Sequence, residues 1–372
     1  MSLETSPSGT KVVITLAAVV IVVAGLRASG GLFLPLLVAT FIAVVSTPLL
    51  TWLERAHVPR VLAISLTLLF DVLALAGLVA LVGRSLSGFQ EAVPRYQRAI
   101  SELVLGMVDL LRAQGAPVEP SDLEALGDPG WFLRVFGDLL RELMEFVSNA
   151  LLVVLLVVFM LFEITPARAR LAVLLGSRQG RLWPLAQAAE KIQRYLVVKT
   201  VLSAITGVAF GVGLAILGVD FPVLWGLGAF LLNFIPSIGP AIATIPPVVI
   251  ALLTLGPGVA AAAAVGCLSV NVVIGNVLEP RLMGEQFGLS TLVVFGSMLF
   301  WGWLWGPVGA LLAVPLTMLL RDTLALAPST RWLAALLASP DWLEAQRAAW
   351  GWTTPAGSTD APTAPRGGDD LL

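Results

Sequence analysis

The chain has 372 residues, of which 58% are hydrophobic and only 12% are charged, and its net charge is −2. A typical soluble domain carries roughly 25% charged residues, so this composition excludes an ordinary soluble protein and offers no electrostatic attraction for a nucleic acid. The single histidine, His57, and the single cysteine, Cys267, exclude an intrachain disulfide and argue against a dedicated transition-metal site. We expect neither a metal nor a cofactor.

Apolar residues occur in runs that are long enough to cross a bilayer, which takes about 20 helical residues. The runs are residues 12–26, 32–53, 61–83, 146–164, 196–218, 222–255, 257–278 and 289–320. Backbone polar groups cannot be left unpaired in lipid, so each run is predicted to be helical. The sequence therefore predicts an all-α polytopic membrane protein with about eight hydrophobic segments.

The distribution of charge predicts the orientation, because short loops rich in Lys and Arg stay on the cytoplasmic side. Segment 163–199 carries seven basic residues against two acidic ones, and we assign it to the cytoplasm. Counting back through the apolar runs places residues 84–145 outside. We expect a multi-pass protein of the bacterial inner membrane with both termini in the cytoplasm.

Residues 84–145 are predicted to be a small exterior domain of two amphipathic helices. Apolar residues follow a 4,3,4,3 spacing in two stripes, Phe89, Val93, Tyr96, Ile100, Leu103, Met107 and Leu110, then Phe132, Phe136, Leu139, Leu143 and Phe146. Such heptad stripes are typical of helices that pack along one face. Either the two helices pack on each other, or the stripes form a contact around the axis of a homo-oligomer.

The other domain boundaries follow the apolar runs and the composition. Residues 1–83 hold the N-terminal membrane segments, and residues 146–321 form a membrane core. Residues 322–352 are predicted to be a cytoplasmic amphipathic segment. The tail, 353–372, is rich in Thr, Pro, Gly and Asp and is predicted to be disordered.

Two apolar runs, 222–255 and 289–320, are longer than one simple crossing requires and are interrupted by Gly and Pro. The breaks are Ile235–Pro240 and Gly302–Pro307. Backbone groups exposed at such breaks are tolerated only inside protein or along a wet cavity, and paired broken segments are typical of transport sites. Each run either crosses the membrane or returns as a re-entrant hairpin, and the charges leave both alternatives open.

We expect the two breaks to approach each other and to line a substrate path. Its candidate residues are Asn233, Pro236, Ser237, Gly239, Pro240, Asn271, Asn276, Gly302, Gly306 and Pro307. Ionisable residues inside the membrane are rare and usually functional. Asp71, in the middle of a run, and Glu279 with Arg281 are candidates for ion coupling or for a gate. The alternatives are a structural hydrogen bond for Asp71 and a local ion pair between Glu279 and Arg281.

Several motifs stand in one order along residues 12–321. They include Glu190–Thr200, Leu224–Gly226, Asn233–Pro240, Glu279–Gly284 and Gly306–Leu316. In this order they resemble the autoinducer-2 exporter family of bacterial membrane proteins. The resemblance implies a permease-like exporter of the inner membrane, and it covers members associated with autoinducer-2 export and others associated with sodium–proton antiport.

Three functions remain open at this stage. The first is secondary export of a small polar molecule, with autoinducer-2 as the named candidate; the second is cation (sodium)–proton antiport. The third is a non-transporting scaffold that binds a partner through the exterior domain. No G-x-x-x-x-G-K-[ST] motif and no catalytic constellation occurs, so we expect neither an ATP-driven pump nor an enzyme. The expected partners are a small polar solute or cation, the lipid bilayer and further copies of the chain.

Overall fold

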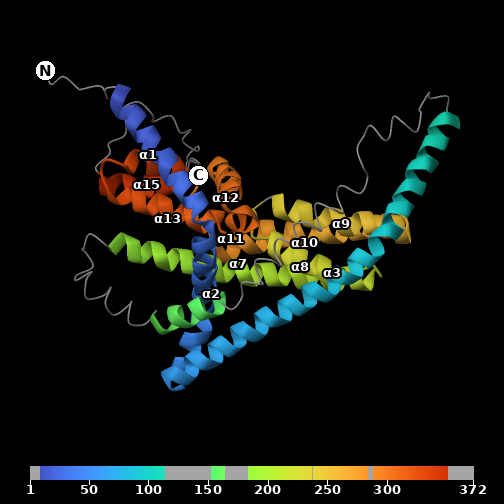
Figure 1. The fold of residues 1–372 in the computed structure, drawn as a ribbon, viewed down its shortest axis with the longest axis horizontal. Coiled ribbons are helices and arrows are strands. Elements are labelled where there is room, and N and C mark those ends of the chain that lie inside the picture. The colour runs from blue at the N-terminus through green and yellow to red at the C-terminus, as the bar shows by residue number, and fades with distance from the viewer. Residues whose placement is uncertain (1–8, 114–151, 164–182, 237, 284–287, 351–372) are drawn as a thin grey trace, which may run out of the picture.

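A computed structural model describes residues 9–113, 152–163, 183–236, 238–283 and 288–350 (Figure 1). These residues form helices and turns, with one isolated bridge between Leu289 and Ala338. Six of the described helices are long and apolar enough to cross a membrane. The predicted all-α polytopic class is therefore confirmed over the described part of the chain.

The helices fall into three groups along the chain. The first group is α1 (Gly9–Ala28), α2 (Gly30–Arg55), α3 (Arg60–Ala113) and a helix over Leu152–Glu163. The second group is α7 (Trp183–Ile216), α8 (Pro222–Leu232), α9 (Ile238–Leu255), α10 (Pro257–Val272), the π-helix η1 (Val273–Leu278) and α11 (Glu279–Met283). The third group is α12 (Thr291–Leu311), α13 (Ala313–Leu326), α14 (Arg331–Leu337) and α15 (Pro340–Trp350).

The N-terminal helices are long and sparsely packed. Only Ser29 separates α1 from α2, and Figure 1 shows the two as one bent rod, so the first two apolar runs meet at a bend. α3 continues without a break across the predicted boundary between residues 83 and 84. The second predicted exterior helix and the predicted tail, 353–372, lie outside the described residues.

The apolar stripe on α3 packs against the central helices. Phe89 and Tyr96 are fully buried in a cluster with Phe210, Leu224 and Trp225, which belong to α7 and α8. The sequence left two partners open for this stripe, the second exterior helix or a neighbouring subunit. The first half of the stripe, which includes Phe89 and Tyr96, packs instead on the chain's own central helices. It anchors α3 to the membrane core, because large aromatic side chains bury most area there.

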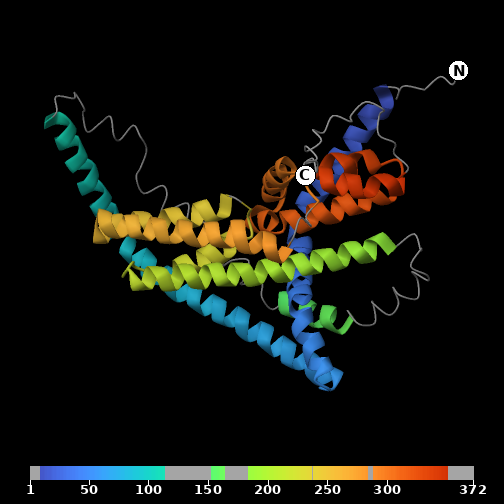
Figure 2. The same cartoon turned by 180° about the vertical axis from the view of Figure 1, so that it is seen from behind.

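Residues 222–255 form a helical hairpin. α8 runs back along α7, and α9 returns along α8 after a turn that begins at Asn233. α10 then packs against α9, with Asn271 beside Pro240. Figures 1 and 2 show α7 to α10 side by side, with both outer ends of the hairpin at the same end of the bundle. The re-entrant alternative therefore describes this segment.

Glycines allow α7 and α8 to approach each other closely. A Cβ atom at Gly226 would lie only 2.6 Å from the carbonyl oxygen of Gly207 and 3.2 Å from the Cα atom of Gly211. Gly207 and Gly211 have the four-residue spacing that is typical of close helix packing in membranes. Backbone contact therefore holds α8, which has only 11 residues, against its neighbour.

Residues 289–320 also fold back on themselves. Helical geometry is lost at Trp305 and at Gly306, whose φ of +65° and ψ of −153° favour glycine. Nε1 of Trp301 in α12 donates a hydrogen bond of 3.0 Å to Oγ1 of Thr317 in α13. This bond joins the two arms of a second hairpin.

The C-terminal helices close the base of the second hairpin. The backbone N–H of Ser339 donates to the carbonyl of Gly288 at 2.8 Å, which brings the start of α15 to the start of the hairpin. A Cβ atom at Gly288 would lie 2.5 Å from Nη1 of Arg321, in the other arm. Both outer ends of the segment are thus adjacent, so the re-entrant alternative also describes residues 289–320.

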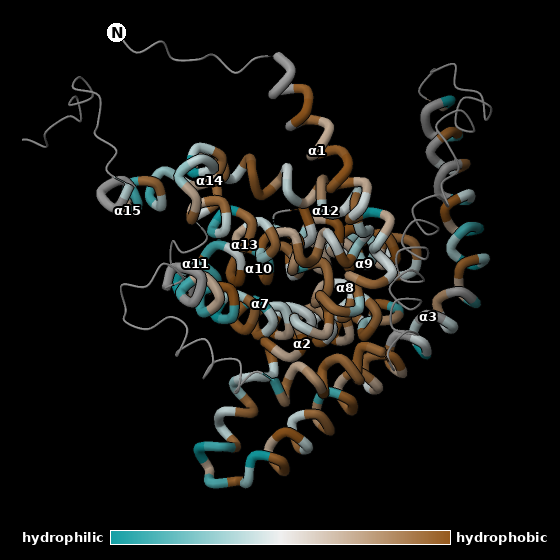
Figure 3. The backbone as a smooth tube through the Cα atoms, turned by 60° about the vertical axis from the view of Figure 1, so that its left-hand side comes forward, coloured by the Kyte–Doolittle hydropathy of each residue, from teal (hydrophilic) through white to brown (hydrophobic). Residues whose placement is uncertain are grey.

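Figure 3, coloured by hydropathy, shows that hydrophobic residues predominate along α1 and the central helices, and many of the exposed side chains are apolar. Side chains such as Ile216, Leu292 and Leu299 are 79%, 83% and 74% exposed. Apolar patches of this extent are rare on soluble monomers. Lipid contact explains them, in agreement with a multi-pass membrane protein.

The glycine contact between α7 and α8 gives a direct test of the first hairpin. We expect Gly226→Ala to lower stability by about 1–3 kcal/mol, because the added methyl group overpacks against the Gly207 carbonyl. The matched control is Gly213→Ala on α7, where a Cβ atom would meet nothing within 4 Å. Thermal unfolding in detergent measures both, and equal melting temperatures for the two variants would contradict the close approach.

Candidate functional site

The two helix breaks meet inside the protein. Ile235, in the first break, packs against a cluster from the second hairpin that includes Trp301, Leu304 and Trp305. The second tip is held in turn by the N-terminal rod, because Nε1 of Trp305 donates to the carbonyl of Leu26 at 3.0 Å. The contact between the tips is apolar, and the polar groups lie on either side of it.

Amide side chains tie the tip of the first hairpin to the helices beside it. Nδ2 of Asn233 donates to Oγ of Ser203 in α7 at 3.0 Å, in a buried position. Nδ2 of Asn271 in α10 donates to the carbonyl of Pro240 at 3.2 Å and to Oγ1 of Thr244 at 3.1 Å. These bonds link the turn and the first residues of α9 to α7 and α10.

Asn271 also leaves one strong acceptor unused. Its Oδ1 atom is buried and has no hydrogen-bond partner within the described residues. A buried acceptor without a donor costs about 1–3 kcal/mol, so such an atom calls for water or a ligand hydroxyl. The sequence suggested Asn271 for the substrate path, and the structure places it beside the first tip.

The remaining candidates differ in their surroundings. Gly239 is buried, and a Cβ atom there would overlap the carbonyl of Leu232. Pro236, next to it, is half-buried. Gly302 has space for a side chain, with Cβ of Ala310 at 3.5 Å.

Three further predicted positions are placed less centrally or not at all. Pro307 follows the Gly306 break and is half-buried. Asn276 lies on the π-helix η1 with an exposed side chain, so it does not join the other amides. Ser237 lies outside the described residues.

Glu279 forms a buried ion pair with a residue that the sequence did not suggest. Nζ of Lys199 in α7 donates to both carboxylate oxygens, at 2.8 and 3.0 Å. The Lys199 side chain is 3% exposed and that of Glu279 is 20% exposed. Arg281 is exposed, so the local pair of Glu279 with Arg281 is wrong. The sequence feature that could have identified Lys199 was its position inside the apolar run 196–218.

A π-helical turn lies directly before Glu279. Residues Val273–Leu278 form η1 between Asn271, which contacts α9, and Glu279, which contacts α7. π-turns are uncommon and occur frequently at functional sites. The turn changes the helical register, so that one continuous rod directs two polar side chains to two different neighbours.

Asp71 belongs to a different part of the molecule. Its Oδ1 atom accepts a hydrogen bond of 2.6 Å from Oγ of Ser46, which links α3 to α2. Its Oδ2 atom is buried and has no partner among the residues described. The structural hydrogen bond therefore exists, and neither hairpin tip contributes to it.

Asp220 fastens α3 to the turn between α7 and α8. Its Oδ2 atom accepts a hydrogen bond of 2.9 Å from the hydroxyl of Tyr96 and a charged one from Arg95. Its carbonyl accepts a bond of 2.8 Å from Nε1 of Trp225. Burial raises the pKa of the Tyr96 hydroxyl to about 12, so that group stays protonated and donates. These bonds tie the Asp220 side chain to α3 and its backbone to α8.

The buried ion pair generates a prediction about stability. We expect Lys199→Met to cost about 3–5 kcal/mol, because it leaves a largely buried carboxylate without its partner. The double variant Lys199→Met with Glu279→Gln should recover most of that loss. Arg281→Gln, at the exposed position, should change little.

Chemical unfolding in detergent distinguishes these variants. An equal loss in Arg281→Gln and Lys199→Met, with no recovery in the double variant, would contradict the observed pairing.

Interrupted helices that meet inside a multi-pass helical bundle are typical of membrane transporters. Comparison with known proteins specifies the class further, since residues 16–328 match the family of AI-2E family transporters. The chain therefore belongs to the AI-2E transporter family.

Several curated relatives match nearly the whole chain. The AI-2 transport protein TqsA of Escherichia coli (strain K12) is 38% identical over 331 residues, which are 89% of this chain and 96% of that protein. A putative transport protein of Haemophilus influenzae is 36% identical over 328 residues, or 87% and 94% of the two chains. The putative transport protein YhhT of Escherichia coli (strain K12) is 36% identical over 310 residues, or 83% and 89%.

Proposed function

We propose that this transporter exports a small, polar, uncharged solute through a path between the two hairpin tips, with autoinducer-2 as the specific candidate. The observation that carries the proposal is the buried, unpaired Oδ1 atom of Asn271 beside the first tip. A solute hydroxyl that donates to this atom would remove the cost of its burial. The name of the Escherichia coli relative, an AI-2 transport protein, agrees with a hydroxylated solute.

The composition of the hairpins supports an uncharged solute. Residues 222–278 and 289–320 contain no Asp, Glu, Lys, Arg or His. The buried charges of Lys199 and Glu279 neutralise each other, and the guanidinium of Arg27 lies 4.5 Å from the centre of the Trp303 ring beside the second break. The hairpins themselves therefore offer a charged solute no counter-charge for its lost hydration, whereas amides and helix-end dipoles suit hydroxyl groups.

The competing functions receive less support. Neither the name of the family nor the names of the relatives indicate cation–proton exchange. The same descriptions name transport, which argues against a scaffold without transport activity. Homo-oligomer formation and a role of Asp71 in ion coupling remain proposals from the sequence.

Efflux from proteoliposomes tests the proposed solute class. We expect Asn271→Ala to reduce efflux of autoinducer-2 by about tenfold or more, because the solute would lose a buried hydrogen bond. Ser269→Ala is the matched control, since Ser269 lies on the exposed side of the same helix and its hydroxyl donates only to the carbonyl of Val265, one turn earlier. A panel of pentoses and sodium under imposed gradients completes the assay.

Two outcomes of this assay would count against the proposal. Sodium flux without any solute flux would indicate that the protein exchanges ions and does not export a solute. Equal efflux in Asn271→Ala and Ser269→Ala would remove Asn271 from the path.

The charge distribution and the two hairpins together predict the orientation. In a Cys267→Ser background, Arg281→Cys should react with a membrane-impermeant thiol reagent only from the cytoplasmic side, because two re-entrant hairpins leave Arg281 inside. Ser101→Cys, at an exposed position of α3, should react only from outside. Labelling of both positions from one side would contradict this topology.

A further inference from the structure

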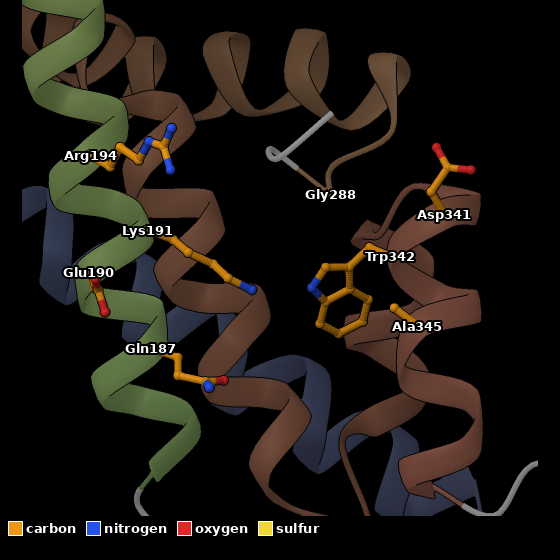
Figure 4. Close-up of a pocket in the computed structure, with 8 residues that line it drawn as sticks. All are labelled: Gln187, Glu190, Lys191, Arg194, Gly288, Asp341, Trp342 and Ala345. Atoms are coloured by element: carbon orange, nitrogen blue, oxygen red, sulfur yellow. The ribbon is translucent and has the colours of Figure 1, made fainter. Parts of the chain in front are cut away.

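A cavity bordered by charged and polar residues lies between the start of α7 and the C-terminal helix α15. Its volume is about 570 Å³, and Gly288 forms part of its wall (Figure 4). One wall is a single face of α7, because Gln187, Glu190, Lys191 and Arg194 follow the i, i+3, i+4, i+7 spacing. This volume is within the range of small-molecule sites.

Trp342 forms the opposite wall, and several contacts hold it in place. The guanidinium of Arg321 lies 4.5 Å from the centre of the Trp342 ring, and the Trp350 ring packs edge-on at 5.6 Å. A Cβ atom at Gly288 would lie 2.6 Å from Cδ1 of Trp342, so the glycine lets the indole approach the backbone. Figure 4 shows Lys191 extending from α7 toward this ring.

The polar side chains around the cavity have no partners within the described part of the chain. Gln187, Glu190, Lys191, Arg194 and Asp341 make no hydrogen bond or ion pair with one another or with other described residues. A second cavity of about 340 Å³ also borders Gln187, Lys191 and Trp342, so these three groups face open space on more than one side. Their bonding capacity is available to a ligand.

The mixed charge of the lining selects the chemistry of that ligand. Lys191 and Arg194 disfavour a simple cation, while Glu190 and Asp341 disfavour a simple anion. A hydroxyl group both donates and accepts, so neighbouring hydroxyls satisfy ammonium and carboxylate groups together. The Trp342 ring adds an apolar surface for the carbon skeleton of the solute.

The position of the cavity connects it to the transport path. Arg194 is followed five residues later by Lys199, a rise of about 7.5 Å along α7. Gly288 directly precedes the second hairpin. The cavity therefore lies at the base of that hairpin, at the end of the bundle that the basic residues assign to the cytoplasm.

We propose that this cavity is a loading site, where a neutral polyhydroxylated solute binds before it enters the path between the hairpin tips. This inference rests on the proposed export function for its direction. The site itself consists of the Trp342 ring, the two basic and two acidic side chains and the Gln187 amide.

Calorimetric binding to the full-length protein in nanodiscs tests the site. The neutral probes are autoinducer-2 and D-ribose, glycine betaine is the zwitterionic probe, and inorganic phosphate is the anionic probe. We expect the neutral probes to bind, and Trp342→Ala to weaken that binding by about tenfold. Trp332→Ala is the matched control, because Trp332 is 58% exposed and does not line the cavity.

A second variant distinguishes a loss of binding from a loss of structure. Lys191→Leu changes an exposed position of α7 that has no described partner, so it should weaken the binding while leaving the unfolding temperature unchanged. The proposal is overturned if the neutral probes bind all variants equally, if they do not bind the unchanged protein, or if betaine or phosphate binds in preference.

Efflux of the same neutral probes from proteoliposomes separates this inference from the proposed function. If the unchanged protein exports the probes and the Trp342→Ala and Lys191→Leu variants export them equally well, the export function stands and the loading site is overturned. Binding that depends on Trp342 without any efflux supports the site and overturns the export function.

Discussion

Both hairpins of this transporter depend on directional hydrogen bonds from side chains, which hold their tips against the rest of the bundle. At the first tip, Asn271 donates to the exposed carbonyl of Pro240, and Asn233 anchors the turn to Ser203. At the second, Thr317 accepts from Trp301, and the Leu26 carbonyl accepts from Trp305. Each tip is thus bonded through side chains to another helix.

The same requirement explains the distribution of small residues. A short helix such as α8 buries little area, so it must lie close to its neighbour to gain dispersion contacts. Gly207, Gly211 and Gly226 provide that proximity without any polar group. Larger aromatic residues, Phe89 and Trp225 among them, then fill the space between this pair and α3.

The membrane character, the positions of the two breaks and the family could be predicted from the sequence, because each follows from composition or from a local order of residues. The partner of Glu279 could not, since Lys199 lies 80 residues away and only the packing of α7 against η1 and α11 joins them. The bond between Tyr96 and Asp220 likewise joins residues 124 positions apart, and no local pattern in the sequence indicates it. A heptad stripe shows that a face of α3 is buried but not which surface covers it.

The apolar nature of the contact between the tips has a mechanical consequence. Among the described residues, directional bonds attach the first tip to α7 and α10, and the second to α13 and the bend between α1 and α2. Ile235 meets the tryptophan cluster only through dispersion forces, which have no preferred direction. The two supports can therefore shear past each other at this point without breaking one of these hydrogen bonds, and this apolar boundary coincides with the proposed route of the solute.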